Sequence, residues 1–97
     1  MVLIIYTKHL KSRLKSRRIP EDYPNIILKA SELRFFDNIE KRNISIKKLK
    51  YNGKLRNMMI AYERNSDIVS IVTIHPITEN QIVNRIKSMR WEKNEKI

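Results

Sequence analysis

The chain has 97 residues, enough for one domain with a single hydrophobic core. It has no cysteine, which excludes a disulfide framework, a thiolate nucleophile and thiolate metal ligands. Twenty-one Lys and Arg residues against ten Asp and Glu residues give a net charge of +11 at pH 7. A charge-rich thermophile surface predicts more balanced signs, so this excess favours binding to a polyanion, above all nucleic acid.

In chain order, residues 2–6 are β-branched and aromatic and predict a short strand. Thr7 is expected to cap a helix that runs to about Arg18, because Leu10 and Leu14 lie four residues apart and share one face. Pro20 then ends the helix.

A second short helix is expected from residue 22 or 23 to residue 31, with Pro24 in its first turn. Its inward side chains are predicted to be Ile27, Leu28 and Ala30.

The pattern then changes to strands. A short one is expected at residues 34–36, and two longer ones, at 43–51 and 54–64, flank Asn52-Gly53. This dipeptide favours a type I′ hairpin turn, which needs positive φ at both positions. Residues 68–75 are almost continuously apolar, which predicts a central strand covered on both faces.

Thr78 and Gln81 match a capping box, which predicts a last helix running to about Arg90. Trp91 is expected to anchor its end, and residues 92–97 to form a flexible tail. The fold class is therefore α+β: a strand, two helices, a three- to four-stranded antiparallel meander and a helix, in one domain over residues 1–91.

The apolar run at residues 1–6 is too short to span a bilayer, and no basic region precedes it. We therefore expect neither signal peptide nor membrane anchor, and a cytoplasmic location. The chain also lacks a Gly-rich phosphate loop, a nucleophile elbow and metal-ligand spacings, so no cofactor and no metal are expected.

The basic residues are concentrated in two blocks. Residues 8–18 contain six Lys and Arg and residues 41–56 contain seven, with no acid in either block. The residues predicted to contact nucleic acid come from these blocks, from the strand after the turn and from the last helix. They are Lys8, Lys11, Arg17, Arg18, Lys48, Lys50, Arg56, Arg64, Arg85 and Arg90.

Two histidines could carry acid–base chemistry near neutral pH. His9 is followed by Arg13 and Arg17 at helical spacing, so the three share one face. His75 ends the apolar strand just before Pro76, and by strand parity it shares a side with Val69, Ile71 and Thr73. The alternatives are a solvated basic face for His9 and a hydrogen bond to a neighbouring loop for His75.

In the strand after the turn, Arg56, Tyr62 and Arg64 share one parity. Tyr62 is predicted to stack a base in the catalytic site, between arginines that clamp phosphate. Lys48 and Lys50 could lie across the turn from Arg56 and Arg64, depending on register. The alternative is an exposed sheet face studded with charge.

Two segments resemble a branch of the RelE/ParE-like toxins, small basic microbial proteins of ribonuclease fold. In that branch a His-bearing first helix is combined with a Thr-x-His-Pro strand. The matching residues are Lys8-His9-Leu10 with Arg13, Arg17, Arg18, Ile19 and Pro20, then Thr73-Ile74-His75-Pro76 with Arg85 and Arg90-Trp91. The element order is also similar over nearly the whole chain. Unlike the better-known RelE pattern, the chain has no C-terminal Tyr.

The resemblance implies metal-free RNA cleavage, often of ribosome-bound mRNA, and an acidic antitoxin protein as partner. The leading hypothesis is thus a RelE-like, metal-independent endoribonuclease. His9 and His75 act as acid and base, with Arg13 and Tyr62 in the same catalytic site. The alternatives are a non-catalytic DNA- or RNA-binding protein, a ParE-like inhibitor that acts by binding protein, and a structural subunit of a basic complex.

Overall fold

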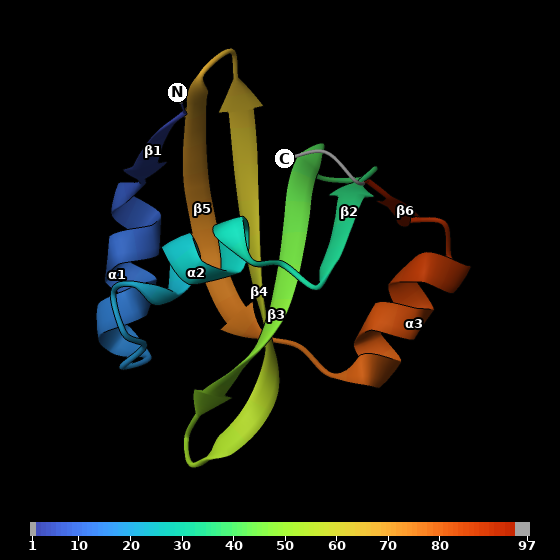
Figure 1. Cartoon of the computed structure of the whole chain (residues 1–97). Helices are drawn as coiled ribbons and strands as arrows, with labels where there is room; N and C mark the ends of the chain where they lie inside the picture. Colours follow the sequence, from blue (N-terminus) through green and yellow to red (C-terminus); the bar gives the residue numbers. More distant parts are fainter. Residues whose placement is uncertain (1, 95–97) are drawn as a thin grey trace.

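A computed structural model describes residues 2–94 of the chain. Its strands form one six-stranded sheet in the order β1-β5-β4-β3-β2-β6 (Figure 1). The strands are β1 (Leu3–Tyr6), β2 (Leu33–Asp37), β3 (Arg42–Tyr51), β4 (Lys54–Asn65), β5 (Ile68–Pro76) and β6 (Trp91–Lys93). The helices are α1 (Lys8–Ser16), α2 (Tyr23–Lys29) and α3 (Glu79–Lys87).

The predicted α+β class and the antiparallel meander are confirmed, because β2 to β5 pair in sequence order. The sheet is larger than expected, since a strand is added at each edge. β1 pairs with β5 in parallel, and β6 pairs with β2 antiparallel. Trp91 is 2% exposed and stacks on Phe35 with ring centroids 5.3 Å apart, which holds β6 against the sheet. The flexible tail expected from residue 92 is therefore wrong at Glu92 and Lys93; residues 95–97 lie outside the described residues.

The long hairpin of β3 and β4 forms as the sequence predicts. Asn52 has φ of 52° and Gly53 has φ of 78°, so both turn positions have the left-handed geometry that a type I′ turn requires. The turn fixes the register that pairs Tyr51 with Lys54 and continues to Asn43 with Tyr62. This hairpin projects beyond the rest of the sheet at the lower end in Figure 1.

The helices begin where predicted and end earlier. The Thr7 hydroxyl accepts a hydrogen bond from the Leu10 N–H, and the Thr78–Gln81 capping box is present. α1 and α3 each stop before a residue with positive φ, Arg18 at 53° and Met89 at 63°. These residues turn the chain out of the helix. In α2, Ala30 is exposed instead of inward, because the helix already ends at Lys29.

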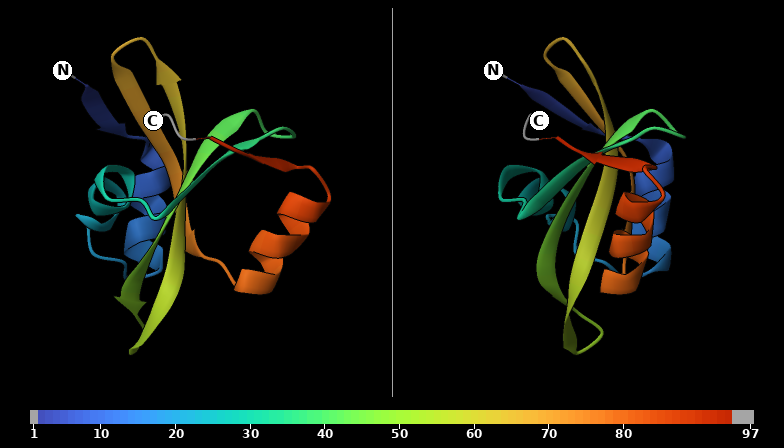
Figure 2. Two further views of the ribbon diagram at one scale, coloured as in Figure 1. Left: turned by 45° about the vertical axis from the view of Figure 1, so that its right-hand side comes forward. Right: turned by 90° about the vertical axis from the view of Figure 1, so that its right-hand side faces the viewer.

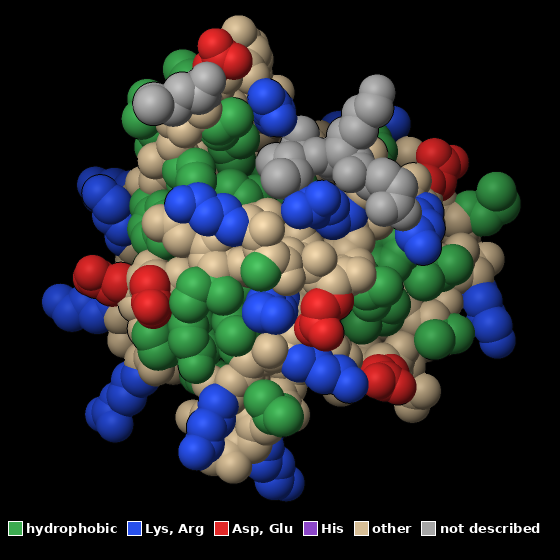
Figure 3. All heavy atoms as spheres, viewed as in Figure 1, with side chains coloured by type: hydrophobic (Ala, Val, Ile, Leu, Met, Phe, Trp, Pro, Cys, Tyr) green, Lys and Arg blue, Asp and Glu red, His purple; other side chains and the backbone are tan. Residues whose placement is uncertain are grey.

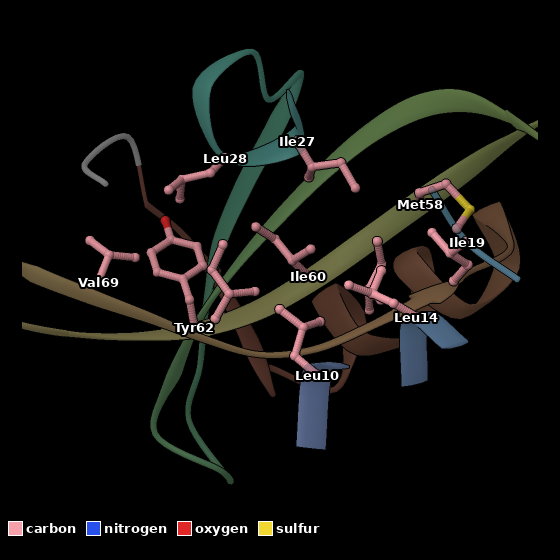
Figure 4. Packing of buried hydrophobic residues seen from close by; sticks show 11 residues of the cluster. Leu10, Leu14, Ile19, Ile27, Leu28, Met58, Ile60, Tyr62 and Val69 are labelled. Atoms are coloured by element: carbon pink, nitrogen blue, oxygen red, sulfur yellow. The ribbon is translucent and has the colours of Figure 1, made fainter. Parts of the chain in front are cut away.

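Two clusters of buried side chains lie on opposite faces of the sheet. One joins α1 and α2 to β4 and β5, and includes Leu10, Leu14, Ile27, Leu28, Ile60, Tyr62 and Val69 (Figure 4). The other joins α3 and β6 to β2, β3 and β4. Figure 2 shows α2 and α3 on opposite sides of the sheet. Both faces of β4 are thus covered, and the central, doubly covered strand is β4 rather than the predicted β5.

No helix within residues 2–94 is long and apolar enough to cross a membrane.

Candidate functional site

A β-bulge decides where His75 points. Across the β4–β5 pair, Ala61 lies opposite Thr73 and Tyr62 opposite Ile71, which leaves Val72 as an extra residue. The odd-numbered side chains of β5 therefore lie on one face of the sheet before Val72 and on the other face after it. Val69 and Ile71 are buried in the cluster with α1 and α2, whereas His75 lies opposite Met59, a member of the cluster with α3. The expectation that His75 shares a side with Val69 and Ile71 is wrong. His75 does lie on the same side as Thr73, as predicted.

His75 is held as a neutral imidazole with a free lone pair. Its Nδ1 lies 2.9 Å from the Pro76 carbonyl oxygen. Because a carbonyl only accepts, Nδ1 carries a hydrogen, and in the neutral ring Nε2 therefore keeps the lone pair. Burial lowers the pKa of His75 below 6.5, and the charges of Arg17, Arg85 and Arg13 lower it further against the opposite effect of the Pro76 bond. At neutral pH the ring can thus accept a proton at Nε2.

α1 covers the part of the β5 edge that β1 does not reach. β1 ends at Tyr6, opposite Ile71, so the following carbonyls of β5 lack a strand partner on that side. The Thr7 hydroxyl donates to the Val72 carbonyl at 3.3 Å, and Arg17 Nη1 donates to the Ile74 carbonyl at 2.8 Å. The Arg17 bond engages one of the five N–H donors of the guanidinium and fixes the group next to His75.

Two further arginines approach His75 from different helices. Arg13, one turn before Arg17 on α1, donates from Nε to His9 Nε2 at 3.3 Å. Arg85, on α3, lies over the Trp91 ring at 4.9 Å, with Nη1 3.9 Å from Met59 Sδ. Since Met59 is the cross-strand neighbour of His75, Arg85 is held beside the imidazole.

A cavity of about 610 Å³ opens at His75. It is lined by Arg17, Tyr51, Asn52, Arg56, His75 and Pro76, with no carboxylate among them. The Tyr51 hydroxyl donates to the Arg17 carbonyl at 2.9 Å, and Arg56 Nε donates to the Tyr51 carbonyl at 3.0 Å. The tip of the hairpin is thereby joined to the end of α1, and the two basic blocks meet at this cavity.

Tyr51 and Asn52 were not among the predicted site residues. The available signal was their position, since they stand at the turn of the hairpin within a basic block. What the sequence does not reveal is that this turn lies against the end of α1.

Tyr62 is in the wrong place for its predicted role. It has the predicted parity with Arg56 and Arg64, but that face is covered by α1 and α2, and Tyr62 is 0% exposed (Figure 4). Its hydroxyl lies 3.4 Å from Ser45 Oγ. A ring enclosed in the core cannot stack a base, so Tyr62 is a core residue.

Of the other predicted basic residues, Arg90 and Arg64 lie apart from the cavity. Arg90 Nε forms an ion pair at 3.0 Å with the buried Asp37, which identifies it as a structural residue. Arg64 lies near the far end of β4, opposite Val69, and its Nε donates to the Ser66 carbonyl.

Lys48 and Lys50 pair with Asn57 and Leu55, so they project from the opposite face of the hairpin to Arg56. Lys48 and Arg56 nevertheless line one cavity near the start of α3. Lys8 is exposed at the start of α1. Lys11 and Arg18, with Lys15, line a separate cavity of about 630 Å³ near Tyr6 and Glu21. Lys and Arg side chains are spread over the face shown in Figure 3, on which no histidine is visible.

The predicted site residues that the structure brings together are therefore His9, Arg13, Arg17, Arg56, His75 and Arg85. No contact joins the two imidazoles, and Arg13 links them by its bond to His9 and its charge at His75. Within residues 2–94 no three His, Asp or Glu side chains are grouped to hold a metal ion.

Comparison with known proteins adds no relative to this description: no family model, no curated protein and no solved structure matches the chain.

Proposed function

We propose that the protein binds RNA at the His75 cavity and cleaves it by attack of the 2′-hydroxyl on the adjacent phosphate, as a RelE-like, metal-independent endoribonuclease. The observation that carries the proposal is a neutral imidazole, with its Nε2 lone pair available, set among the guanidinium groups of Arg13, Arg17 and Arg85. A base beside several fixed cations is what phosphodiester transfer needs.

In the proposed reaction His75 Nε2 takes the proton of the 2′-hydroxyl. The 2′-oxygen forms a bond to phosphorus, and the bond from phosphorus to the 5′-oxygen breaks, which leaves a 2′,3′-cyclic phosphate. Arg17 and Arg56, which line the cavity, and Arg13 bind the non-bridging oxygens as negative charge develops on them. Tyr51, instead of Tyr62, is the aromatic ring beside this path.

The leaving 5′-oxygen needs a proton, and we assign this donation to His9. In the free protein His9 Nε2 accepts a hydrogen bond from Arg13, so that nitrogen carries no proton. A phosphate that engages Arg13 would release Nε2 to take one up. An acidic partner protein that masks these cations belongs to the same proposal, as the RelE resemblance implies.

The test is cleavage of free and ribosome-bound RNA in the presence of EDTA. The His75→Asn variant is the informative one, because an Asn amide can still donate to the Pro76 carbonyl but offers no base. It should lose at least about 100-fold in rate, the usual contribution of a positioned base, while its RNA affinity is retained. His9→Gln should slow cleavage by a smaller factor.

Absence of cleavage by the wild type, or an undiminished rate in His75→Asn, contradicts the catalytic assignment. Salt-sensitive RNA or DNA binding without cleavage would instead support the non-catalytic alternative, which the same arginines favour.

A further inference from the structure

A second cavity, of about 420 Å³, adjoins the His75 cavity and shares two lining residues with it. It lies between the hairpin and the start of α3. Its lining residues are Lys48, Leu55, Arg56, Asn57, Pro76, Ile77, Thr78 and Glu79. Arg56 and Pro76 line both cavities, so a group bound at Arg56 can touch both spaces.

The second cavity combines apolar walls with a few polar side chains. Leu55, 73% exposed, lies on the hairpin, and Pro76 and Ile77 come from the connection between β5 and α3. Asn57 and Thr78 add hydrogen-bonding side chains, and Lys48 adds a positive charge. Apolar walls with a few placed polar groups are typical of sites for small planar ligands, including unstacked bases.

Glu79 stands in the first turn of α3, where a negative charge is favourable at the helix N-terminus. Among the described residues, it is the one carboxylate that lines the second cavity. The helix cap beside it is completed by Thr78 and Gln81, whose side chains satisfy each other's backbone N–H groups. Within residues 2–94, no hydrogen bond or ion pair engages the Glu79 carboxylate. A carboxylate that lines an otherwise basic and apolar cavity is available to bind donors on a ligand.

We propose that the second cavity binds the guanine base of a nucleotide next to the scissile phosphate, with Glu79 as the residue that selects it. The inference rests on the proposed function, because the RNA strand enters through the His75 cavity. Guanine presents two adjacent donors, N1–H and the N2 amino group, which match the two oxygens of a carboxylate. Adenine and cytosine present a ring nitrogen acceptor at the equivalent position, which a carboxylate repels. Arg56, shared by the two cavities, binds the phosphate that connects base and cleavage site.

The test compares guanosine with inosine, which lacks only the N2 amino group, and with adenosine. In one arm the 3′-monophosphates of the three nucleosides are titrated into the protein, and the NMR shifts of the Asn57 and Glu79 amides are followed. In the other arm, oligoribonucleotides that differ only in this base are cleaved. A bidentate pair corresponds to discrimination of roughly 5- to 150-fold against a base that cannot form it, and we expect guanosine to be preferred in both arms by that factor.

Glu79→Gln should abolish the preference, because the amide offers one acceptor and one donor in place of two acceptors. Glu92→Gln, the same change of charge on the exposed side of β6, is the matched control and should keep the preference.

Equal binding of guanosine and inosine monophosphates, or a preference that survives in Glu79→Gln, overturns the guanine site. If guanosine monophosphate is preferred in a Glu79-dependent way but no RNA is cleaved, the base site stands and the ribonuclease proposal fails. If RNA is cleaved without regard to the base, the ribonuclease proposal stands and the base site fails.

Discussion

Asp37 and His75 are both ionisable groups withdrawn from solvent, and the hydrogen bonds around each decide its charge. Burial raises the pKa of Asp37, but bonds from the Glu40 N–H, the Trp91 indole, the Ile39 N–H and Arg90 outweigh it, so the net pKa lies below 3.8. His75 has one bond, to a carbonyl, and three arginines nearby, so its neutral form is favoured. The first group is a structural anion, and the second is available as a base.

Asp37→Asn is predicted to destabilise the fold by about 2–4 kcal/mol at neutral pH. The Asp37 Oδ2 atom accepts from both Trp91 and Arg90 at 3.0 Å, and an amide nitrogen in its place would set donors against donors. The measurement is the free energy of unfolding in urea.

The stability lost in Asp37→Asn should be smaller at acidic pH than at neutral pH. Because the folded pKa of Asp37 lies below its usual 3.8, its contribution is complete above 3.8 and is lost as the pH falls through the folded pKa. The difference in free energy of unfolding between wild type and Asp37→Asn must therefore become smaller as the pH falls into the acidic range. A gap of constant size from neutral to acidic pH would contradict this description.

The sequence identifies some site residues correctly, but it does not give the orientation or the exposure of their side chains. His75 could be found because it ends an apolar strand before Pro76. Its orientation could not be derived, since nothing local marks the bulge at Val72. Tyr62 has the predicted parity, but its exposure depends on α1 and α2 crossing that face, which is a long-range packing choice.

At the scale of elements, α1 acts as an edge cover. β1 protects β5 only as far as Ile71, and the next turns of chain form a helix whose cap residues, Thr7 and Arg17, bond to the Val72 and Ile74 carbonyls. Thr7 has two tasks here, since its hydroxyl accepts from the Leu10 N–H and donates to the Val72 carbonyl. The same contacts position Arg13 and Arg17 at His75.

Thr7→Val is predicted to lower the free energy of unfolding by about 1–2 kcal/mol, because an isosteric apolar group removes both the cap and the edge bond. Thr7→Ser, which retains the hydroxyl, is the control and should stay close to wild type. Urea unfolding of the two variants provides the measurement. Equal stability of Thr7→Val and wild type would show that the helix does not depend on this residue.

The elements with local chemical signals were the predictable ones. Asn52-Gly53 fixes the β3–β4 hairpin, and the capping box fixes the start of α3. The two edge strands were harder. β1 was recognised as a strand, but its parallel pairing with β5 joins residues distant in sequence. β6 is only three residues long, and it forms because Trp91 stacks on Phe35.

For the whole molecule, the charge of +11 is less informative than its distribution. The two acid-free basic blocks meet where Tyr51 bonds to the end of α1. Around that contact lie the cavity and His75, while other cations, such as Arg90, serve the fold. We therefore propose a local site, in which RNA phosphate binds at the hairpin end of the sheet and not over the basic surface in general.

Arg56 and Arg64 provide a matched pair for the test. Both are exposed, both lie on β4 with the same parity, and each donates from Nε to a nearby backbone carbonyl. They are eight residues apart, about 26 Å along a strand. RNA affinity is measured against salt concentration for Arg56→Gln and Arg64→Gln. We predict that Arg56→Gln weakens binding and reduces the log–log salt slope by about 1, whereas Arg64→Gln leaves the slope unchanged. Equal effects of the two substitutions, or a loss only in Arg64→Gln, would contradict the location of the site.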